Sequence, residues 1–228
     1  MGADPLTLPG VDVERRAPSV ALPPEAYRQA GLGQWFTPPW LAAEVAAMAG
    51  VRGLVVLEPS AGSGRIVRAC LDAGARRVIA YEIDPRWAAE LRRTFAGEPV
   101  DVHEGDFLRA PLDGPAREAE RIVGNPPYDH GCDTAHLERY ADLLERTRGA
   151  SATMLLRTVA LHSAERWDGQ GGEVGRGVWS RVGLVELAPT VHRVPFGEEA
   201  GKIDVSIFRF VRRAESAGAV RWITGRGQ

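Results

Sequence analysis

Cysteine and lysine are scarce in this sequence of 228 residues. It contains two cysteines, Cys70 and Cys132, and a single lysine, Lys202. Two isolated thiols cannot form a disulfide framework, so the composition favours a reducing compartment. Positive charge is carried almost wholly by arginine, and the formal net charge is only -2. Because that charge creates no global field for a polyanion, it weighs against a tight autonomous DNA-binding protein, though not against an enzyme that visits DNA.

Long apolar runs are also missing. No stretch approaches the roughly 18 apolar residues that a membrane-spanning helix needs. The first residues include prolines and acidic residues instead of a basic segment followed by an apolar one, so a signal peptide is not indicated. We therefore expect a soluble, cytoplasmic protein that makes no contact with a membrane.

The length suits one α/β domain around a single core. Residues 1–30 contain several prolines and show no sustained periodicity, which predicts a flexible N-terminal arm. We expect a single domain over 31–213 and a weakly patterned tail over 214–228. Within the domain, 163–183 is rich in glycine and charge and lacks a clear period, so it is expected to be an irregular loop on the substrate side.

Apolar runs of strand length alternate with helical patterns along the chain. This alternation predicts a doubly wound, Rossmann-like α/β fold with a mostly parallel sheet. The expected strands cover 53–57, 77–81, 100–105, 121–124, 152–156, 182–187 and 204–211, and the expected helices cover 38–49, 65–73, 86–95 and 134–147. Open sheets of this kind bind ligands at the carboxyl ends of their strands, so the segments that follow the strands are the candidate site.

The most informative of these segments is Asn125-Pro126-Pro127-Tyr128, which follows the apolar run 121–124. Two successive prolines forbid both strand continuation and an immediate helix, so the chain must leave the strand as a rigid, extended loop. Such a loop offers a side-chain amide, a carbonyl outside the sheet ladder and an aromatic ring. These groups can accept hydrogens from an amino group and stack on a planar base.

A glycine-containing turn follows the first expected strand. It reads Glu58-Pro59-Ser60-Ala61-Gly62-Ser63-Gly64 and leads into a helical pattern. Glycines between a strand and a helix let a backbone approach a ligand closely. Val67 stands where the third glycine of a dinucleotide-binding motif would be, so that type of site is weakly supported.

Two further segments flank this turn in the sequence. Thr37 is a good helix N-cap, and Pro38 suits the first position of the alanine-rich helix that follows. Glu82 comes directly after the second strand, where a carboxylate is placed to hold both ribose hydroxyls of a nucleoside ligand. Ile83 would then pack on the adenine ring of that ligand. Asp84 precedes Pro85 and is better explained as a helix cap.

Together these segments resemble the amino-methyltransferases that use S-adenosylmethionine, chiefly the N6-adenine DNA methyltransferases. Asn125 to Tyr128 is similar to their catalytic motif, and Phe36-Thr37-Pro38 before a helix looks like the N-terminal cofactor motif of the γ-ordered members. The order of the matches is also that of the γ group. The same tetrapeptide occurs in enzymes that methylate RNA amino groups or the amide of glutamine.

The resemblance implies a seven-stranded methyltransferase sheet whose last strand is antiparallel, with S-adenosylmethionine as the cofactor. Its implied ligands on the methionine side are Phe36, Thr37, Pro38, Glu58, Pro59, Ala61, Gly62 and Gly64. Glu58 would meet the amino group of the methionine moiety. On the nucleoside side, Glu82 and Ile83 are joined by Asp106, which would accept a hydrogen bond from the adenine amino group, and by Phe107, which would stack nearby.

In the mechanism that this resemblance implies, the Asn125 side-chain oxygen and the Pro126 carbonyl accept both hydrogens of the target amino group. The nitrogen lone pair is then localised and faces the methyl group for in-line displacement. In duplex DNA the base must first leave the stack, and Tyr128 would hold it by its face. Phe196 is a weaker candidate for the opposite face of the base.

Adenine in DNA is the favoured substrate, and the amino group of adenine or guanine in RNA is the alternative. We expect no separate target-recognition domain, so recognition would come from loops such as 163–183, from a partner protein, or from relaxed specificity. A protein-glutamine methyltransferase is the alternative from another class. A degenerate cofactor-binding subunit is disfavoured, because every catalytic position is filled.

His130, Cys132 and His136 could gather two or three metal ligands. No second cluster of cysteine or histidine would complete a four-coordinate site, and methyl transfer needs no metal. We therefore expect no metal site.

Overall fold

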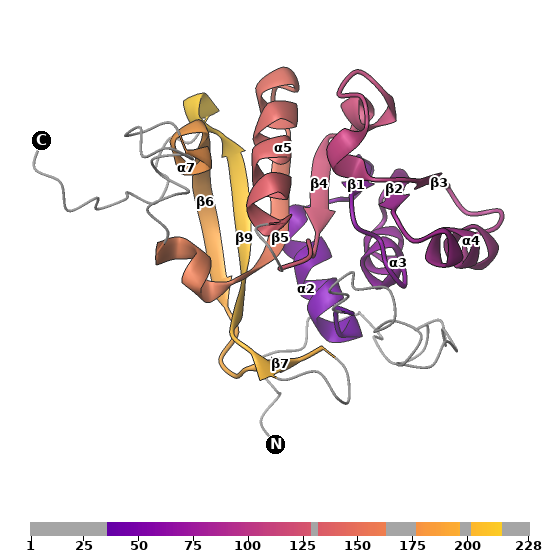
Figure 1. The fold of residues 1–228 in the computed structure, drawn as a ribbon, viewed down its shortest axis with the longest axis horizontal. Coiled ribbons are helices and arrows are strands. Elements are labelled where there is room, and N and C mark those ends of the chain that lie inside the picture. Colours follow the sequence, from indigo (N-terminus) through magenta and orange to yellow (C-terminus); the bar gives the residue numbers. More distant parts are fainter. Residues whose placement is uncertain (1–35, 129–131, 163–176, 197–201, 216–228) are drawn as a thin grey trace, which may run out of the picture.

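The computed structural model describes residues 36–128, 132–162, 177–196 and 202–215 (Figure 1). Seven strands form one sheet in the order β3-β2-β1-β4-β5-β9-β6. Their bounds are β1 Val55–Glu58, β2 Arg77–Glu82, β3 Val100–Glu104, β4 Arg121–Gly124, β5 Ser151–Arg157, β6 Val182–Pro189 and β9 Val205–Arg212. Strands β1 to β5 are parallel, and β9 runs antiparallel to both of its neighbours. The predicted doubly wound sheet with an antiparallel last strand is confirmed.

Helices cover both faces of this sheet. They are α2 Pro39–Ala49, α3 Arg65–Asp72, α4 Pro85–Thr94, α5 Cys132–Arg146 and the short α7 Val178–Arg181. Single 3-10 turns are η1 Phe107–Arg109, η2 Pro115–Glu118, η4 Thr158–His162 and η5 Arg213–Glu215, and a small hairpin pairs β7 Val194–Pro195 with β8 Lys202–Ile203. Figure 1 shows α5 lying along the middle strands of the sheet.

The core consists of two apolar clusters, one on each face. Leu57 and Ile79 pack with residues of α5 and α7, whereas their chain neighbours Val56 and Val78 pack with residues of α2, α3 and α4. Successive residues of a strand point to opposite faces. Strands buried on both faces therefore read as continuous apolar runs, which is why the sequence revealed them.

The start of α2 differs from the prediction by one position. Pro38 is the N-cap residue and Pro39 is the first helical residue, and no side chain caps the helix. Thr37 was expected to be the cap, but its hydroxyl oxygen instead accepts a hydrogen bond from the Asn125 side chain. The predicted cap of α4 is confirmed, since Asp84 accepts from the Arg86 N–H, and the helix begins at Pro85, one residue before the predicted range.

The predicted irregular segment 163–183 contains the short helix α7. Val178 and Trp179 in α7 are buried in the core. Arg181 pairs with Asp142 and Glu145 of α5, which ties the two helices together. The predicted loop therefore extends too far at its carboxyl end, because Val178 and Trp179 pack into the core instead of lying in a loop. The rest of it, 163–176, lies outside the described residues, as do the predicted arm and residues 216–228.

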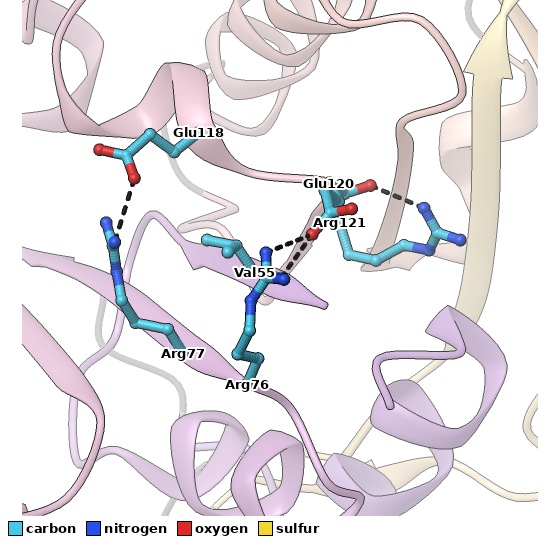
Figure 2. A network of polar contacts seen from close by, with 6 residues as sticks. All are labelled: Val55, Arg76, Arg77, Glu118, Glu120 and Arg121. Atoms are coloured by element: carbon cyan, nitrogen blue, oxygen red, sulfur yellow. Dashed lines mark hydrogen bonds and ion pairs between the residues drawn. The ribbon is translucent and has the colours of Figure 1, made fainter. Parts of the chain in front are cut away.

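A polar network joins the amino ends of three strands, at the end of the sheet opposite the predicted catalytic loop 125–128. Oε2 of Glu120 accepts from the Val55 backbone N–H at 3.0 Å and from Arg76 at 3.2 Å (Figure 2). Arg77 pairs with Glu118 at 3.0 Å in the same region. These contacts fix the register of β1 and β2 against the segment that enters β4.

Across the described residues, no helix combines the length and the apolar character that crossing a bilayer requires.

Candidate active site

The predicted cofactor loop and the predicted catalytic loop lie against each other. Strands β1 and β4 are neighbours in the sheet, so the segments that follow them emerge side by side. The Ser60 hydroxyl donates to the backbone carbonyl of Asn125 at 3.3 Å, although the two residues are 65 positions apart in the chain. The site is therefore assembled by the topology of the sheet.

The two glycines of the turn after β1 serve different purposes. Both have positive φ, at 50° for Gly62 and 78° for Gly64. A Cβ atom on Gly64 would lie 2.7 Å from the side chains of Leu91 and Phe95, so this glycine lets α3 approach α4. Among the described residues, a Cβ atom on Gly62 would meet only the ring of Phe36, at 3.6 Å. Gly62 therefore leaves space above the loop beside an aromatic ring.

Glu58, at the end of β1, is completely buried. Its Oε1 accepts from the Ser60 backbone N–H at 3.2 Å, whereas its Oε2 has no hydrogen-bond partner within the described part of the chain. Burial raises the pKa of this carboxyl well above its ordinary value, and the nearby Glu82 raises it further. A buried acceptor without a partner costs free energy, so this atom is suited to receive a donor from a ligand.

Glu82, at the end of β2, is also buried, and both of its oxygens accept backbone hydrogen bonds. Oε2 accepts from the Gly62 N–H at 2.6 Å and Oε1 from the Asp84 N–H at 2.8 Å. Burial raises its pKa in spite of these bonds. Ile83 beside it is half exposed, at 50%, which is unusual for a large apolar side chain. The carboxylate predicted to hold the ribose thus also holds the glycine loop.

The other predicted cofactor residues occupy varied environments. Phe36 packs against Trp87, with ring centroids 5.4 Å apart, at the side of the glycine loop. Pro38 is half-buried, whereas Pro59 and Ala61, within the turn, are buried. Asp106 caps η1 by accepting from the Leu108 N–H at 2.9 Å. That capping bond uses the oxygen Oδ1 and leaves Oδ2 near Arg109, at 3.4 Å.

Phe107 lies in the core, in contrast to the stacking position expected for it. Its side chain is 3% exposed and packs against Tyr81, His136 and Tyr140. The ring is enclosed because the 3-10 turn η1 directs it inward onto α5. His136 is buried in the same group of rings, and His130, the first residue of the considered metal cluster, lies outside the described residues.

The Asn125 side chain is held at both ends of its amide. Nδ2 donates to the Thr37 hydroxyl oxygen at 3.1 Å, and Oδ1 accepts from the Tyr128 hydroxyl at 2.5 Å. Both partners are buried, with Thr37 and Tyr128 each 5% exposed. The acceptor atom that the target amino group would need therefore faces the tyrosine hydroxyl.

Tyr128 is enclosed more fully than its predicted stacking role suggests. Burial raises the pKa of its hydroxyl far above the ordinary value, so the group acts as a neutral donor. Phe196 is buried beside it, and the two rings meet edge to face at 6.4 Å and 83°. A base held between them would need two parallel faces, so this pair must rearrange before it can receive one. Pro126 is buried and Pro127 half-buried next to them.

Ser60 and Arg65 were not predicted from the sequence as parts of the site. Ser60 joins Glu58 to the Asn125 backbone, and Arg65 donates from Nη1 to the Thr37 carbonyl at 3.2 Å. Ser60 lies inside the glycine turn, and that position was the only signal available. Arg65 is the first residue of α3 and had no signal, because its partner is 28 positions away.

Comparison with known proteins places this chain in a family. No family model matches the sequence. An rRNA adenine N-6-methyltransferase of Saccharopolyspora erythraea is 35% identical over 170 residues, which cover 71% of this chain and 40% of that relative. Among solved structures, the 23S rRNA methyltransferase ErmE is 30% identical with a TM-score of 0.56, and the match covers 80% of this chain and 71% of that one. The chain belongs to the adenine N6-methyltransferase family.

More distantly related solved structures share the fold of this family member. A proposed RNA methyltransferase from Pyrococcus horikoshii superposes with a TM-score of 0.62 at 20% identity, covering 80% of this chain and 88% of that one. At that identity the likeness concerns the fold alone. The chain spans less than half the length of the curated relatives it matches.

Proposed function

We propose that this protein transfers a methyl group from S-adenosylmethionine to the N6 amino group of adenine in RNA, with ribosomal RNA as the first candidate. The observation that supports this most directly is the Ser60 to Asn125 hydrogen bond, because it sets the acceptor loop against the cofactor loop. The sequence favoured DNA, but the relatives are named for ribosomal RNA. RNA therefore replaces DNA as the preferred substrate.

The residues around the glycine turn fit the proposed cofactor. Oε2 of Glu58 is a buried acceptor without a partner in the described part of the chain, as the ammonium of a methionine moiety would require. The space at Gly62, beside Phe36, admits a ligand close to the backbone. Glu82 and the exposed Ile83 follow β2, where a ribose and an adenine ring would lie. When bound, S-adenosylmethionine supplies an electrophilic methyl group on a sulfonium.

Asn125 and Pro126 would prepare the nucleophile. An adenine amino nitrogen is weakly nucleophilic because its lone pair is delocalised into the ring. Acceptance of its two hydrogens by Oδ1 of Asn125 and the carbonyl of Pro126 would localise the lone pair and orient it. Tyr128 would support the base by its ring, and Phe196 would cover the other face. As the sequence suggests, recognition of the target would come from loops such as 163–183 or from a partner protein, or the specificity would be relaxed.

Methyl transfer from labelled cofactor to an rRNA fragment, duplex DNA and a protein-glutamine acceptor tests this function. Each product is digested to nucleosides or amino acids and separated. We expect label on N6-methyladenosine from RNA, little on DNA, and none on glutamine. The Asn125→Ala variant serves as the control for contaminating activity. Label on glutamine alone, or on DNA in preference to RNA, would contradict the proposal.

A further inference from the structure

Thr37 connects three parts of the site. Its hydroxyl oxygen accepts from Nδ2 of Asn125 at 3.1 Å, and its backbone carbonyl accepts from Nη1 of Arg65 at 3.2 Å. Asn125 belongs to the catalytic loop, and Arg65 begins the helix that follows the glycine turn. The Thr37 side chain is 5% exposed, so water competes little for its hydroxyl. The resemblance assigned Thr37 to the methionine end of the cofactor, whereas its hydroxyl lies on the catalytic amide.

The direction of the Asn125 amide decides whether it can accept. An asparagine side chain has one end that donates and one that accepts. A target amino group brings hydrogens, so only Oδ1 can receive it. With Nδ2 held by Thr37, Oδ1 is directed to Tyr128, whose hydroxyl donates to it at 2.5 Å. The tyrosine hydroxyl thus occupies the donor position that the target amino group would take.

The backbone of Asn125 is fixed independently of its side chain. Ser60 donates to the Asn125 carbonyl at 3.3 Å. Loss of the Thr37 contact would therefore leave the amide held only through its contact with the Tyr128 hydroxyl, among the contacts described above, without displacing the loop. The target amino group has to replace that hydroxyl, so the amide would be poorly oriented when the base binds. Small errors in the direction of a reacting or activating group slow the reaction strongly, because the rate advantage of a bound substrate depends on holding these groups in the reactive geometry.

We propose that Thr37 is a positioning residue that holds the Asn125 amide with its oxygen toward the target base. This rests on the proposed function, since it assumes that Asn125 accepts from the substrate. Thr37 acts through Asn125 and does not itself touch the transferring methyl group. Its contribution appears in the rate of methyl transfer and not in the affinity for the cofactor.

Thr37→Val and Thr37→Ser test the proposal. Valine keeps the shape and removes the hydroxyl, whereas serine keeps the hydroxyl. We measure single-turnover rates at saturating S-adenosylmethionine on the best acceptor, and cofactor affinity by calorimetry. We expect Thr37→Val to slow transfer about ten- to a hundredfold with cofactor affinity within about twofold of wild type, and Thr37→Ser to restore most of the rate. Weaker cofactor binding with a normal rate at saturation would make Thr37 a cofactor ligand and overturn the proposal.

A double-mutant cycle separates positioning from loss of structure. In the Asn125→Ala background Thr37→Val should produce no further loss of rate, since the group that it orients is absent. Equal losses in both backgrounds would overturn the proposal. If Thr37→Val proves unfolded by thermal melting, Thr37→Ala takes its place in the cycle. The identity of the wild-type product tests the proposed function separately, so failure of one claim is distinguishable from failure of the other.

Discussion

The backbone N–H of Gly62 donates a 2.6 Å hydrogen bond to Oε2 of Glu82, so the carboxylate at the end of β2 closes the glycine turn that follows β1. The other oxygen of Glu82 accepts from the Asp84 N–H, at the start of α4. One buried side chain therefore sets the relative positions of two segments that are predicted to bind the cofactor. Its removal should affect both the fold and the proposed binding of cofactor.

Glu82→Ala should weaken S-adenosylmethionine binding by about tenfold or more and lower the melting temperature, because two backbone donors lose their acceptor. Glu90→Ala is the matched control, since Glu90 forms an exposed pair with Arg93 on the same helix that Asp84 caps. Calorimetry and thermal unfolding measure the two effects. Unchanged cofactor affinity in a folded Glu82→Ala protein would contradict the assigned role.

Glu58→Gln should change stability and binding in opposite directions. The pKa of Glu58 is higher in the folded chain than in the unfolded chain. Its contribution to stability is therefore fully present below the ordinary carboxyl pKa of about 4.3, and is lost as pH rises toward the folded value. The neutral glutamine avoids that loss. The variant should melt near the wild-type temperature at pH 4 and above it at pH 8, while binding cofactor more weakly.

Melting curves across pH measure this difference, and Glu90→Gln is a control because its pKa is lowered instead of raised. If the melting temperature of Glu58→Gln relative to that of the wild type does not rise between pH 4 and pH 8, the buried carboxyl carries no such penalty.

Gly64→Ala should be more damaging than Gly97→Ala, although the two glycines have similar positive φ angles of 78° and 82°. Within the described part of the chain, nothing lies within 4 Å of a Cβ atom at Gly97, so this variant measures backbone strain, about 1 to 2 kcal/mol. At Gly64 the Cβ atom would lie 2.7 Å from Leu91 and Phe95, which adds roughly 1 to 3 kcal/mol of overpacking. Denaturant unfolding of the two variants should separate backbone strain from overpacking. Equal losses of unfolding free energy would mean that α3 and α4 move apart at little cost.

Glu120→Ala should lower the free energy of unfolding by roughly 1 to 3 kcal/mol, since it leaves the Val55 N–H without its acceptor at the buried start of β1. Glu118→Ala removes only a partly exposed ion pair with Arg77 and should cost at most about 0.5 kcal/mol. Urea unfolding compares them. Equal effects would show that the Val55 bond contributes little.

The sequence indicated the sheet well because its strands are buried on both faces, and it placed Glu58, Glu82 and Asn125 because each follows an apolar run. The sequence could not identify the residues that the side chains of the site contact. Local rules made Thr37 a helix cap, but a contact with Asn125, 88 positions away, takes its hydroxyl. Tyr128 looked available for stacking because nothing nearby in the chain covers it. Phe196, from the segment after β6, packs against its ring.

The Asn125 and Tyr128 variants test the proposed catalytic loop directly. Asn125→Ala should leave cofactor affinity nearly intact and slow methyl transfer to adenine by something like two to three powers of ten, the usual loss when one preorganised hydrogen-bonding group is removed. Tyr128→Phe removes only the hydroxyl that faces Oδ1 of Asn125. Its effect on single-turnover rate should be small, because the target amino group replaces that donor once the base is bound.

Tyr128→Ala removes the ring as well. It should weaken capture of the base, and the penalty should shrink on a single-stranded acceptor whose target adenine is already unstacked, since unstacking a base costs a few kcal/mol. Comparison of hairpin-stem and single-stranded acceptors, with Tyr128→Phe as the matched control, isolates the contribution of the ring. An Asn125→Ala enzyme with near-normal single-turnover rates would refute the acceptor mechanism. A Tyr128→Ala penalty that is equal on both acceptors would assign the ring to packing against Phe196 instead of to the base.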